Sequence, residues 1–292
     1  MITVTGLFNY PMKGCEAVPV ARLNFHNGNP HGDHDWMVVD NDGVFISARN
    51  EPRICLIRAH NGPDGSLVLS AHGVLGLRVE TPKLENVVEV HLHGEILQAL
   101  DCGDRAAEWL SKFLGTRSRL VKRHWRLPRK KKIRTARPDD LQSVEDVEVS
   151  FADAYPVLLV GEESVAALSS HIGRNLSILR FRPTVVVSGE KAFAEDAWRD
   201  MRFEGGHHPP SHLRGIKLCS RCRVPWVNPL TGEIDEPGIL DALIEMGRVL
   251  PKYPGHPDLG SGAMLGMNCI FVSVSDGNSI AVGDELTVLS RW

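Results

Sequence analysis

The stretch Met37-Val38-Val39-Asp40-Asn41-Asp42-Gly43-Val44-Phe45-Ile46 places an Asp-Gly turn between two apolar runs. Glycine supplies the positive φ that a tight turn requires, so this pattern predicts a β-hairpin. A second hairpin signal follows, because Pro63-Asp64-Gly65 precedes the apolar run Ser66-Leu67-Val68-Leu69-Ser70. We therefore predict that residues 1 to about 95 form a strand-rich barrel or sandwich.

A helix and a basic loop are predicted after these strands. Asp101 to Leu114 carries apolar residues at helical spacing, and Gly115 follows as a C-cap. Arg123 to Arg137 is basic and bounded by proline, which predicts an exposed, solvated loop. Its run Pro128-Arg129-Lys130-Lys131-Lys132 lacks interleaved aromatic residues, so we expect no nucleic-acid partner.

A second unit is predicted to begin near Val147, which divides the chain into residues 1–145 and residues 146–292. Apolar runs and helical spacing predict its elements, namely strands at Tyr155 to Val160, Thr184 to Ser188, Ile270 to Val274 and Leu286 to Leu289, and helices at Ser164 to Leu176 and Gly238 to Leu250. The predicted fold class is a β-rich α+β protein.

The composition is that of an ordinary globular protein, with 292 residues, 42% hydrophobic and 24% charged. The net charge of -3 gives no global field that would attract nucleic acid or an anionic membrane. The N-terminal residues do not resemble a signal peptide, and no apolar run approaches the roughly 20 residues of a membrane span. We expect a cytoplasmic protein without a membrane span, and reduced cysteines.

Chemistry is predicted at Lys217-Leu218-Cys219-Ser220-Arg221-Cys222-Arg223, where two thiols bracket a serine and an arginine. Thiolates bind soft or borderline metals, and an adjacent guanidinium favours the charged form of a thiol. Three interpretations compete: half of a zinc site, a redox dithiol, and a loop in which one cysteine ligates a metal cofactor.

The first two interpretations depend on the flanking residues. A zinc site would use the tetrahedral set His208, His212, Cys219 and Cys222, and the role of the loop containing His207 stays open. A thioredoxin-like dithiol should open a helix, but Pro225 and Pro229 follow closely and prevent a continuous one.

The third interpretation needs basic residues that are dispersed along the chain, namely Lys13, Arg49, Arg180 and Arg182. Guanidinium and ammonium groups supply directed donors to phosphate oxygens. A phosphate-bearing cofactor would require several of these residues to converge, which sequence spacing alone does not show.

A succession of motifs runs in order along nearly the whole chain: Tyr10-Pro11-Met12-Lys13, Asp35-Trp36-Met37-Val38-Val39-Asp40, Ala48-Arg49-Asn50-Glu51-Pro52-Arg53, Arg180-Phe181-Arg182-Pro183, Ala194-Glu195-Asp196-Ala197-Trp198, Cys219-Ser220-Arg221-Cys222 with Thr231-Gly232, and Ile280-Ala281-Val282-Gly283-Asp284. Together they resemble the MOSC family, and most closely its amidoxime-reducing components and their bacterial relatives.

The resemblance implies a MOSC N-terminal β-barrel-like domain (1–145) packed on a MOSC β-barrel domain with peripheral helices (146–292), and a molybdenum cofactor of the molybdopterin type between them. It implies that Cys222 ligates molybdenum. The residues that it implies for binding the rest of the cofactor are Lys13, Gly14, Arg49, Ser164, Arg182, Thr184, Ser220 and Arg221. Pyridoxal phosphate is not expected.

The chain departs from the family pattern at four positions. Gly14 replaces a serine, His34 an arginine, Thr184 an asparagine and Asn268 a tyrosine. At position 34, the imidazole of histidine, which is mostly neutral at pH 7, replaces an arginine guanidinium that is always charged and can form two parallel hydrogen bonds.

The resemblance further implies a reductase of N-hydroxylated compounds such as amidoximes, hydroxylamines and N-hydroxylated bases. Asp196 and His34 are the candidate general acids. Electrons would arrive from a separate donor protein of the ferredoxin, flavoprotein or cytochrome type. The alternatives are a carrier of the cofactor or of sulfur, with Cys222 as a persulfide, and a zinc-stabilised protein without catalytic activity.

Overall fold

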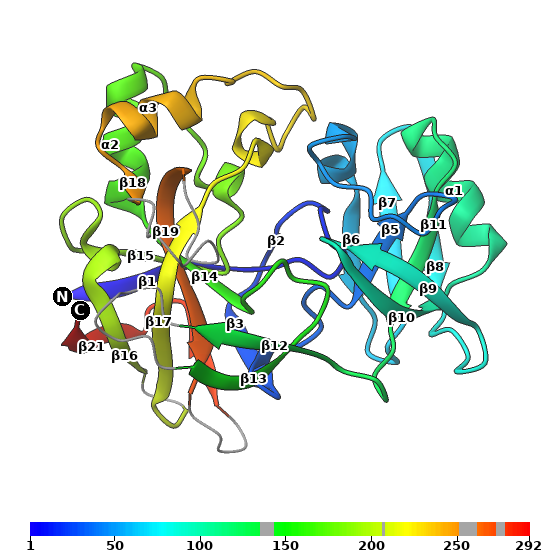
Figure 1. Ribbon diagram of the computed structural model, residues 1–292, viewed down its shortest axis with the longest axis horizontal. Helices are drawn as coiled ribbons and strands as arrows, with labels where there is room; N and C mark the ends of the chain where they lie inside the picture. The colour runs from blue at the N-terminus through cyan, green and yellow to red at the C-terminus, as the bar shows by residue number, and fades with distance from the viewer. Residues whose placement is uncertain (135–142, 206–207, 251–261, 273–277) are drawn as a thin grey trace.

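A closed barrel of seven strands forms the larger lobe, which we call the barrel lobe (Figure 1). The computed structural model describes residues 1–134, 143–205, 208–250, 262–272 and 278–292. The strands in barrel order are β14 (Val157–Gly161), β15 (Val185–Ser188), β1 (Ile2–Asn9), β21 (Glu285–Arg291), β16 (Trp198–Glu204), β17 (Ser211–Ser220) and β19 (Gly262–Phe271), which pairs back with β14. Strands β14 and β15 are parallel, and the other neighbours are antiparallel.

Helices cover one end of this barrel. Helix α2 (Glu162–Ile172) is the crossover that the parallel pair β14–β15 needs, and it ends at Gly173 with φ 73°. Helix α3 (Ile239–Glu245) lies beside α2, at the upper left of Figure 1. Both helices pack on a buried cluster around Phe181, which belongs to the 3-10 helix η2 (Ile178–Phe181). This packing fixes the segment that continues into Arg182.

Gly266 lies where β19 closes the barrel against β14. Its φ is +83°, and a Cβ there would lie 2.9 Å from Val160 Cγ2 and 3.0 Å from the backbone oxygen of Leu159. We expect Gly266→Ala to lower the free energy of unfolding by about 2 kcal/mol, measured by urea denaturation. Gly28→Ala is the matched control, since Gly28 has φ +78° but open space around it. Equal losses in the two variants would refute the steric contribution.

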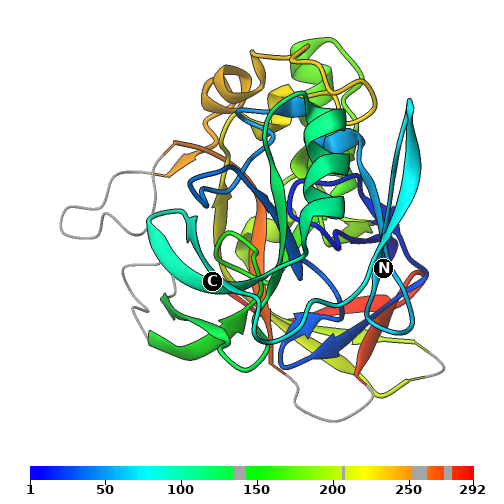
Figure 2. The same cartoon turned by 90° about the vertical axis from the view of Figure 1, so that its right-hand side faces the viewer.

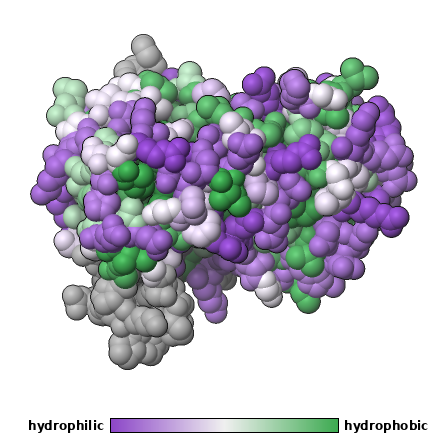
Figure 3. Space-filling view, turned by 90° about the horizontal axis from the view of Figure 1, so that it is seen from above, coloured by the Kyte–Doolittle hydropathy of each residue, from purple (hydrophilic) through white to green (hydrophobic). Residues whose placement is uncertain are grey.

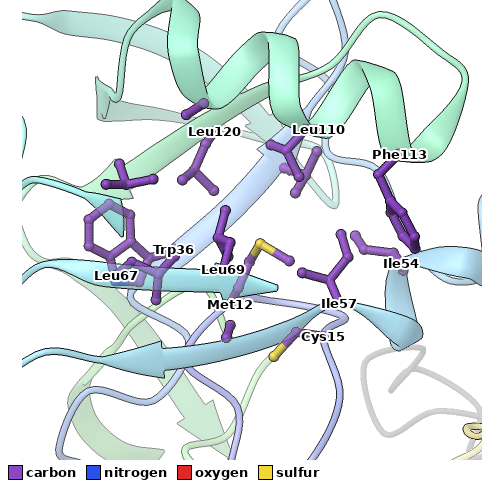
Figure 4. Packing of buried hydrophobic residues seen from close by; sticks show 14 of the residues in the cluster. Met12, Cys15, Trp36, Ile54, Ile57, Leu67, Leu69, Leu110, Phe113 and Leu120 are labelled. Atoms are coloured by element: carbon purple, nitrogen blue, oxygen red, sulfur yellow. The ribbon is translucent and has the colours of Figure 1, made fainter. Parts of the chain in front are cut away.

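The smaller lobe, here the N-terminal lobe, encloses its own core between two sheets and one helix (Figure 4). The side chains of Met12, Trp36, Leu69 and Leu110 point toward one another inside it. The first sheet has the order β5 (Trp36–Val39), β11 (Arg119–Arg123), β10 (Glu95–Asp101) and β9 (Val87–Leu92). The second sheet has the order β6 (Arg58–Asn61), β7 (Leu67–Ala71) and β8 (Val74–Val79).

Helix α1 (Asp104–Leu114) covers this core on the side that faces the viewer in Figure 2. Its buried residues, Ala106, Leu110, Phe113 and Leu114, form one stripe at helical spacing. Gly115 ends the helix in the left-handed conformation with φ 76°. The predicted helix and its C-cap are therefore confirmed, as is the β-rich α+β fold class.

The chain passes between the lobes more than once. Strand β1 lies in the barrel although it belongs to the predicted first domain, and residues 10–14 then enter the N-terminal lobe, where Met12 forms a bridge with Trp36. The division at residues 145 and 146 stays a prediction. The remaining short elements are β2 (Val18–Pro19), β3 (Arg22–His26), β4 (Asn29–Pro30), β18 (Val249–Leu250), β20 (Ser279–Ala281), η1 (Pro52–Leu56), η3 (Ala194–Ala197) and η4 (Val224–Trp226).

The solvated loop predicted for the basic run is wrong. Residues Arg129–Arg134 form β12, which pairs with β13 (Ser143–Val149). The side chain of Arg129 is only 6% exposed, because Glu95 at the start of β10 accepts two hydrogen bonds from it, each of 2.8 Å. An ion pair between strands thus replaces the expected hydration of Arg129, whereas Lys130 and Lys132 are exposed to solvent and residues 135–137 lie outside the described residues.

The Arg129–Glu95 pair predicts a pH dependence of stability. Hydrogen bonds from Arg129 and Lys131 lower the pKa of Glu95 from 4.5 to about 2. A carboxyl whose folded pKa is depressed stabilises the protein fully above its unfolded pKa, and this contribution is lost as the pH falls through the folded pKa. We expect Glu95→Gln to be less stable than wild type by about 1 kcal/mol at pH 7. In urea unfolding series, the difference should shrink between pH 4.5 and pH 2; a constant difference would contradict this assignment.

Other predicted elements also differ from the structure. The strand expected over Ile270 to Val274 coincides only with the end of β19, which stops at Phe271, and Ser273 and Val274 lie outside the described residues. The helix expected over Gly238 to Leu250 ends at Glu245, because Gly247 turns the chain with φ 74° and Arg248 N donates to Leu243 O. Residues Val44 to Ile46 form isolated bridges rather than a named strand, although Phe45 does pair with Val39 across the predicted turn.

The surface is mainly polar on the face shown in Figure 3, where hydrophobic residues occur in small groups among the coloured atoms. No helix within the described ranges combines the length and apolarity needed to cross a bilayer.

Candidate functional site

Residues 10–14, here called the link, join the two lobes, and Tyr10 is their first residue. The Tyr10 hydroxyl donates to Pro183 O at 3.1 Å, and its backbone N–H donates to Asp33 Oδ1 at 2.7 Å. Burial raises the pKa of Tyr10 above its ordinary value of 10.0, so the phenol is neutral and serves as a donor. These contacts of Tyr10 place the later residues of the link, Lys13 and Gly14, next to Arg182 of the barrel lobe.

Lys13 is a buried cation in this link. Its backbone N–H donates to Trp36 O at 2.8 Å, and its ammonium forms an ion pair with Asp153. Burial lowers the pKa of Lys13, and the nearby charge of Arg182 acts in the same direction. The Asp153 carboxylate acts in the opposite direction and raises the pKa of Lys13, so it offsets part of the cost of burying the ammonium.

Gly14 explains one departure from the family pattern. Its φ is +89°, and a Cβ would lie 3.2 Å from both Cδ1 and Cγ2 of Ile54. A serine in this backbone conformation would be strained. The glycine therefore suits the conformation of the link in this chain.

Arg182 presents an unsatisfied donor to the site. Its Nη1 donates to Cys15 O at 2.7 Å, and its guanidinium carbon lies 4.1 Å from the centre of the Tyr10 ring. Its Nη2 is buried and has no hydrogen-bond partner among the described residues. Buried donors are nearly always paired, so this nitrogen is available to water or to an anionic ligand.

The cysteine loop begins at the exposed end of β17. Arg221 N donates to Ala263 O at 2.8 Å, and Arg221 Nη2 donates to Phe181 O at 2.9 Å. Arg221 Nη1 lies 3.0 Å from Cys219 Sγ, whereas Arg221 Nε is buried without a partner in the described part of the chain. The positive charges of Arg182 and Arg221 both act to lower the pKa of Tyr10, although burial raises it by more. Lys13, Arg182 and Arg221 thus converge around the link, as a phosphate-bearing cofactor requires.

Cys222 differs from Cys219 in its surroundings. It is half-buried, and within the described ranges its thiol makes no hydrogen bond. Val224, two residues later, packs against the core of the N-terminal lobe. The loop is therefore held between the lobes with one thiol bound to Arg221 and the other, Cys222, open to a ligand.

The other predicted binding residues are engaged within the protein. Ser164 is buried in the first turn of α2, where its hydroxyl donates to Glu195 Oε2 at 2.9 Å and accepts from Phe193 N at 2.7 Å. Thr184 Oγ1 accepts from Leu158 N at 3.1 Å. Arg49 is half-buried, and its Nε donates a hydrogen bond of 3.5 Å to Ser47 Oγ.

The two candidate acids lie on different segments. His34, with φ +51°, has Nδ1 bonded to Asp33, and its ring centre is 5.9 Å from that of Tyr10. Asp196 lies in η3 and forms an ion pair with Arg248. The sequence did not single out Asp153 or its partner His93, since neither belongs to a recognisable motif.

The four zinc candidates do not converge. His208 Nε2 is bonded to Asp284 Oδ2 at 3.0 Å. His212 and Cys219 lie on the same strand, β17, and seven residues of strand separate their Cα atoms by roughly 20 Å. In the described part of the chain, no group of three or more His, Cys, Asp or Glu residues is placed to hold a metal ion. His207 lies outside the described residues.

Comparisons with known proteins identify both parts of the chain. The model of the MOSC N-terminal beta barrel domain matches residues 1–117, and that of the MOSC domain matches residues 146–287. The mitochondrial amidoxime-reducing component 1 of Homo sapiens is 32% identical, over 99% of this chain and 83% of that protein. The Xenopus laevis component 1 is 32% identical over 82% of this chain and 70% of that protein. The Bos taurus component 2 is 30% identical over 97% and 82%, respectively.

Proposed function

The chain belongs to the MOSC family, and from this membership we propose that it is a molybdenum-cofactor-dependent reductase of N-hydroxylated compounds. The relatives named amidoxime-reducing components support the substrate class, and the MOSC domain supports the cofactor.

One observation carries the proposal. Among the described residues, the buried guanidinium nitrogens Arg182 Nη2 and Arg221 Nε have no hydrogen-bond partner, and Arg221 directly precedes Cys222, whose thiol makes no hydrogen bond. An anionic group would satisfy both nitrogens, and a thiolate is the ligand that a soft metal selects. The donor set therefore fits a group that carries both a phosphate and a metal.

In the proposed site, each residue has one role. Cys222 holds the metal as a thiolate, while Lys13, Arg182 and Arg221 neutralise the phosphate. Ser164 and Thr184 hold the surrounding backbone through the hydrogen bonds described above, and Ser220 and Arg49 flank the group. When bound, the molybdenum supplies the electrons that remove the hydroxyl oxygen from nitrogen.

The reaction also needs protons, because removing the hydroxyl group as water consumes two of them for every two electrons. His34 is our proposed donor, since its Nδ1 is fixed by Asp33 and its Nε2 makes no bond to any described residue. Asp196 is the alternative. The electrons come from a separate donor protein of the ferredoxin, flavoprotein or cytochrome type.

The test is metal analysis of protein expressed with molybdate, combined with an assay of amidoxime reduction using an artificial electron donor. Equimolar molybdenum together with reduction supports the proposal. If the protein binds molybdenum but reduces no N-hydroxylated compound, the reductase is rejected and the protein is a carrier of the cofactor or of sulfur. Zinc that is lost from the double variant His208→Ala, His212→Ala would reject the molybdenum cofactor.

A further inference from the structure

Asp153 lies between β13 and β14, and its backbone is held in place by cations of β12. Arg129 Nη1 donates to Ala152 O at 2.5 Å, and Lys131 Nζ donates to Asp153 O at 3.0 Å. On the other side, Phe151 N donates to His34 O at 2.9 Å. A carboxylate on a backbone tied at three points keeps its direction, as a recognition group must.

The two oxygens of the Asp153 carboxylate differ. Oδ1 accepts from both Lys13 Nζ and His93 Nε2, the latter at 2.8 Å. Oδ2 accepts from no residue in the described ranges, and 70% of the side chain is exposed to solvent. One oxygen therefore anchors the group while the other stays open to a ligand.

The carboxylate is also kept ionised. The charge of Lys13 and the contact with His93 hold the pKa of the solvent-exposed Asp153 carboxyl well below 3.8. An ionised carboxylate only accepts hydrogen bonds. Asp153 pairs with Lys13, which we assign to the phosphate of the cofactor, and this contact ties its carboxylate to the proposed site.

We propose that Asp153 is the specificity-determining residue of this site, accepting at Oδ2 a hydrogen bond from an N–H group next to the N-hydroxy nitrogen. The need for an N–H donor favours amidoximes and N-hydroxyguanidines, which carry an NH2 group on the carbon bonded to the N-hydroxy nitrogen. Hydroxamic acids carry a carbonyl oxygen at that place, which repels the carboxylate and leaves it without a donor. The inference rests on the proposed function and narrows its substrate class.

Benzamidoxime and benzhydroxamic acid form a matched pair, because they differ mainly in this NH2 group and carbonyl oxygen. We expect wild-type protein loaded with molybdenum to prefer benzamidoxime in kcat/KM. Asp153→Asn should lower that preference by roughly tenfold to a hundredfold, since its amide N–H donates to the carbonyl of the hydroxamic acid. Rates are expressed per bound molybdenum, so that a change in cofactor content does not affect the ratio.

A binding measurement separates this role from turnover. Calorimetry with the same loaded protein should show that Asp153→Asn weakens the binding of benzamidine by at least about tenfold and strengthens that of benzamide, whose carbonyl oxygen accepts from the new amide N–H. Asp64→Asn is the charge-matched control, because Asp64 is bound by Arg78 and Ser66 in the turn before β7. It should alter neither the kinetic preference nor the two affinities.

The outcomes distinguish the two proposals. If wild-type protein reduces neither substrate, the reductase is rejected, while the benzamidine affinities still decide the role of Asp153. If reduction occurs but Asp153→Asn changes neither the preference nor the benzamidine affinity, the role of Asp153 is overturned.

Discussion

Cys222→Ser abolishes molybdenum binding and lowers N-hydroxy reductase activity by more than about a hundredfold, if the thiolate is the metal ligand as we expect. The reason is chemical: a serine hydroxyl stays protonated at neutral pH and is a hard oxygen ligand, so it does not replace a soft thiolate. Elemental analysis of the purified variant and an amidoxime assay measure the two losses.

Cys219→Ser is the matched control, because the same atom is changed three residues away. Cys219 Sγ already contacts Arg221 Nη1, so a serine hydroxyl there retains an interaction with the guanidinium. We expect this variant to keep its molybdenum and most of its activity. Equal losses in both variants would show that the pair acts together, and an unaffected Cys222→Ser would remove the thiolate from the site.

Local patterns predicted the parts of the fold that depend on neighbouring residues. The Asp-Gly turn before Val44, the stripe of α1 and its Gly115 C-cap were visible, because turn geometry and helical spacing involve only a few consecutive residues. Only Cys219 accepts a hydrogen bond from the Arg221 side chain, and the different roles of Cys219 and Cys222 stay a prediction.

The misses share a physical cause, which is pairing between distant segments. The basic run is a strand because it pairs with β13, and the partner that buries Arg129, Glu95, lies 34 positions away. Asp153 belongs to the candidate site because it forms an ion pair with Lys13, which lies 140 positions earlier in the sequence. A single sequence carries no record of such partners, so the predicted loop at β12 was wrong and Asp153 was overlooked.

The same limit explains why the convergence of the cations stayed open until the structure was known. Tyr10 brings Lys13 to Arg182 through its bond to Pro183, across 173 positions of sequence. The family resemblance supplied the residues for this site, and the structure supplied the reason that they meet, which is the link between β1 and the N-terminal lobe.

Arg182→Met should separate cofactor binding from folding. In cofactor-free protein, the substitution removes a buried guanidinium with an unsatisfied Nη2, and this gain offsets the lost bond to Cys15 O. We therefore expect the free energy of unfolding to change by less than about 1 kcal/mol. The molybdenum content should fall by about tenfold or more, because a phosphate loses a charged donor. Urea denaturation and elemental analysis measure the two effects.

Arg180→Met is the neighbouring control, since Arg180 lies in the 3-10 helix η2, which ends immediately before Arg182. Arg180 is buried and pairs with Asp235 at 2.7 Å, so its loss leaves that carboxylate without its cation. Breaking such a pair costs about 3 kcal/mol whether or not the cofactor is present. Bound cofactor stabilises only the folded state, so loading should raise the free energy of unfolding. We expect Arg180→Met that is still folded to show this increase, and Arg182→Met to show little of it. If Arg182→Met instead unfolds the cofactor-free protein like Arg180→Met, then Arg182 supports the fold and its free nitrogen does not mark a ligand.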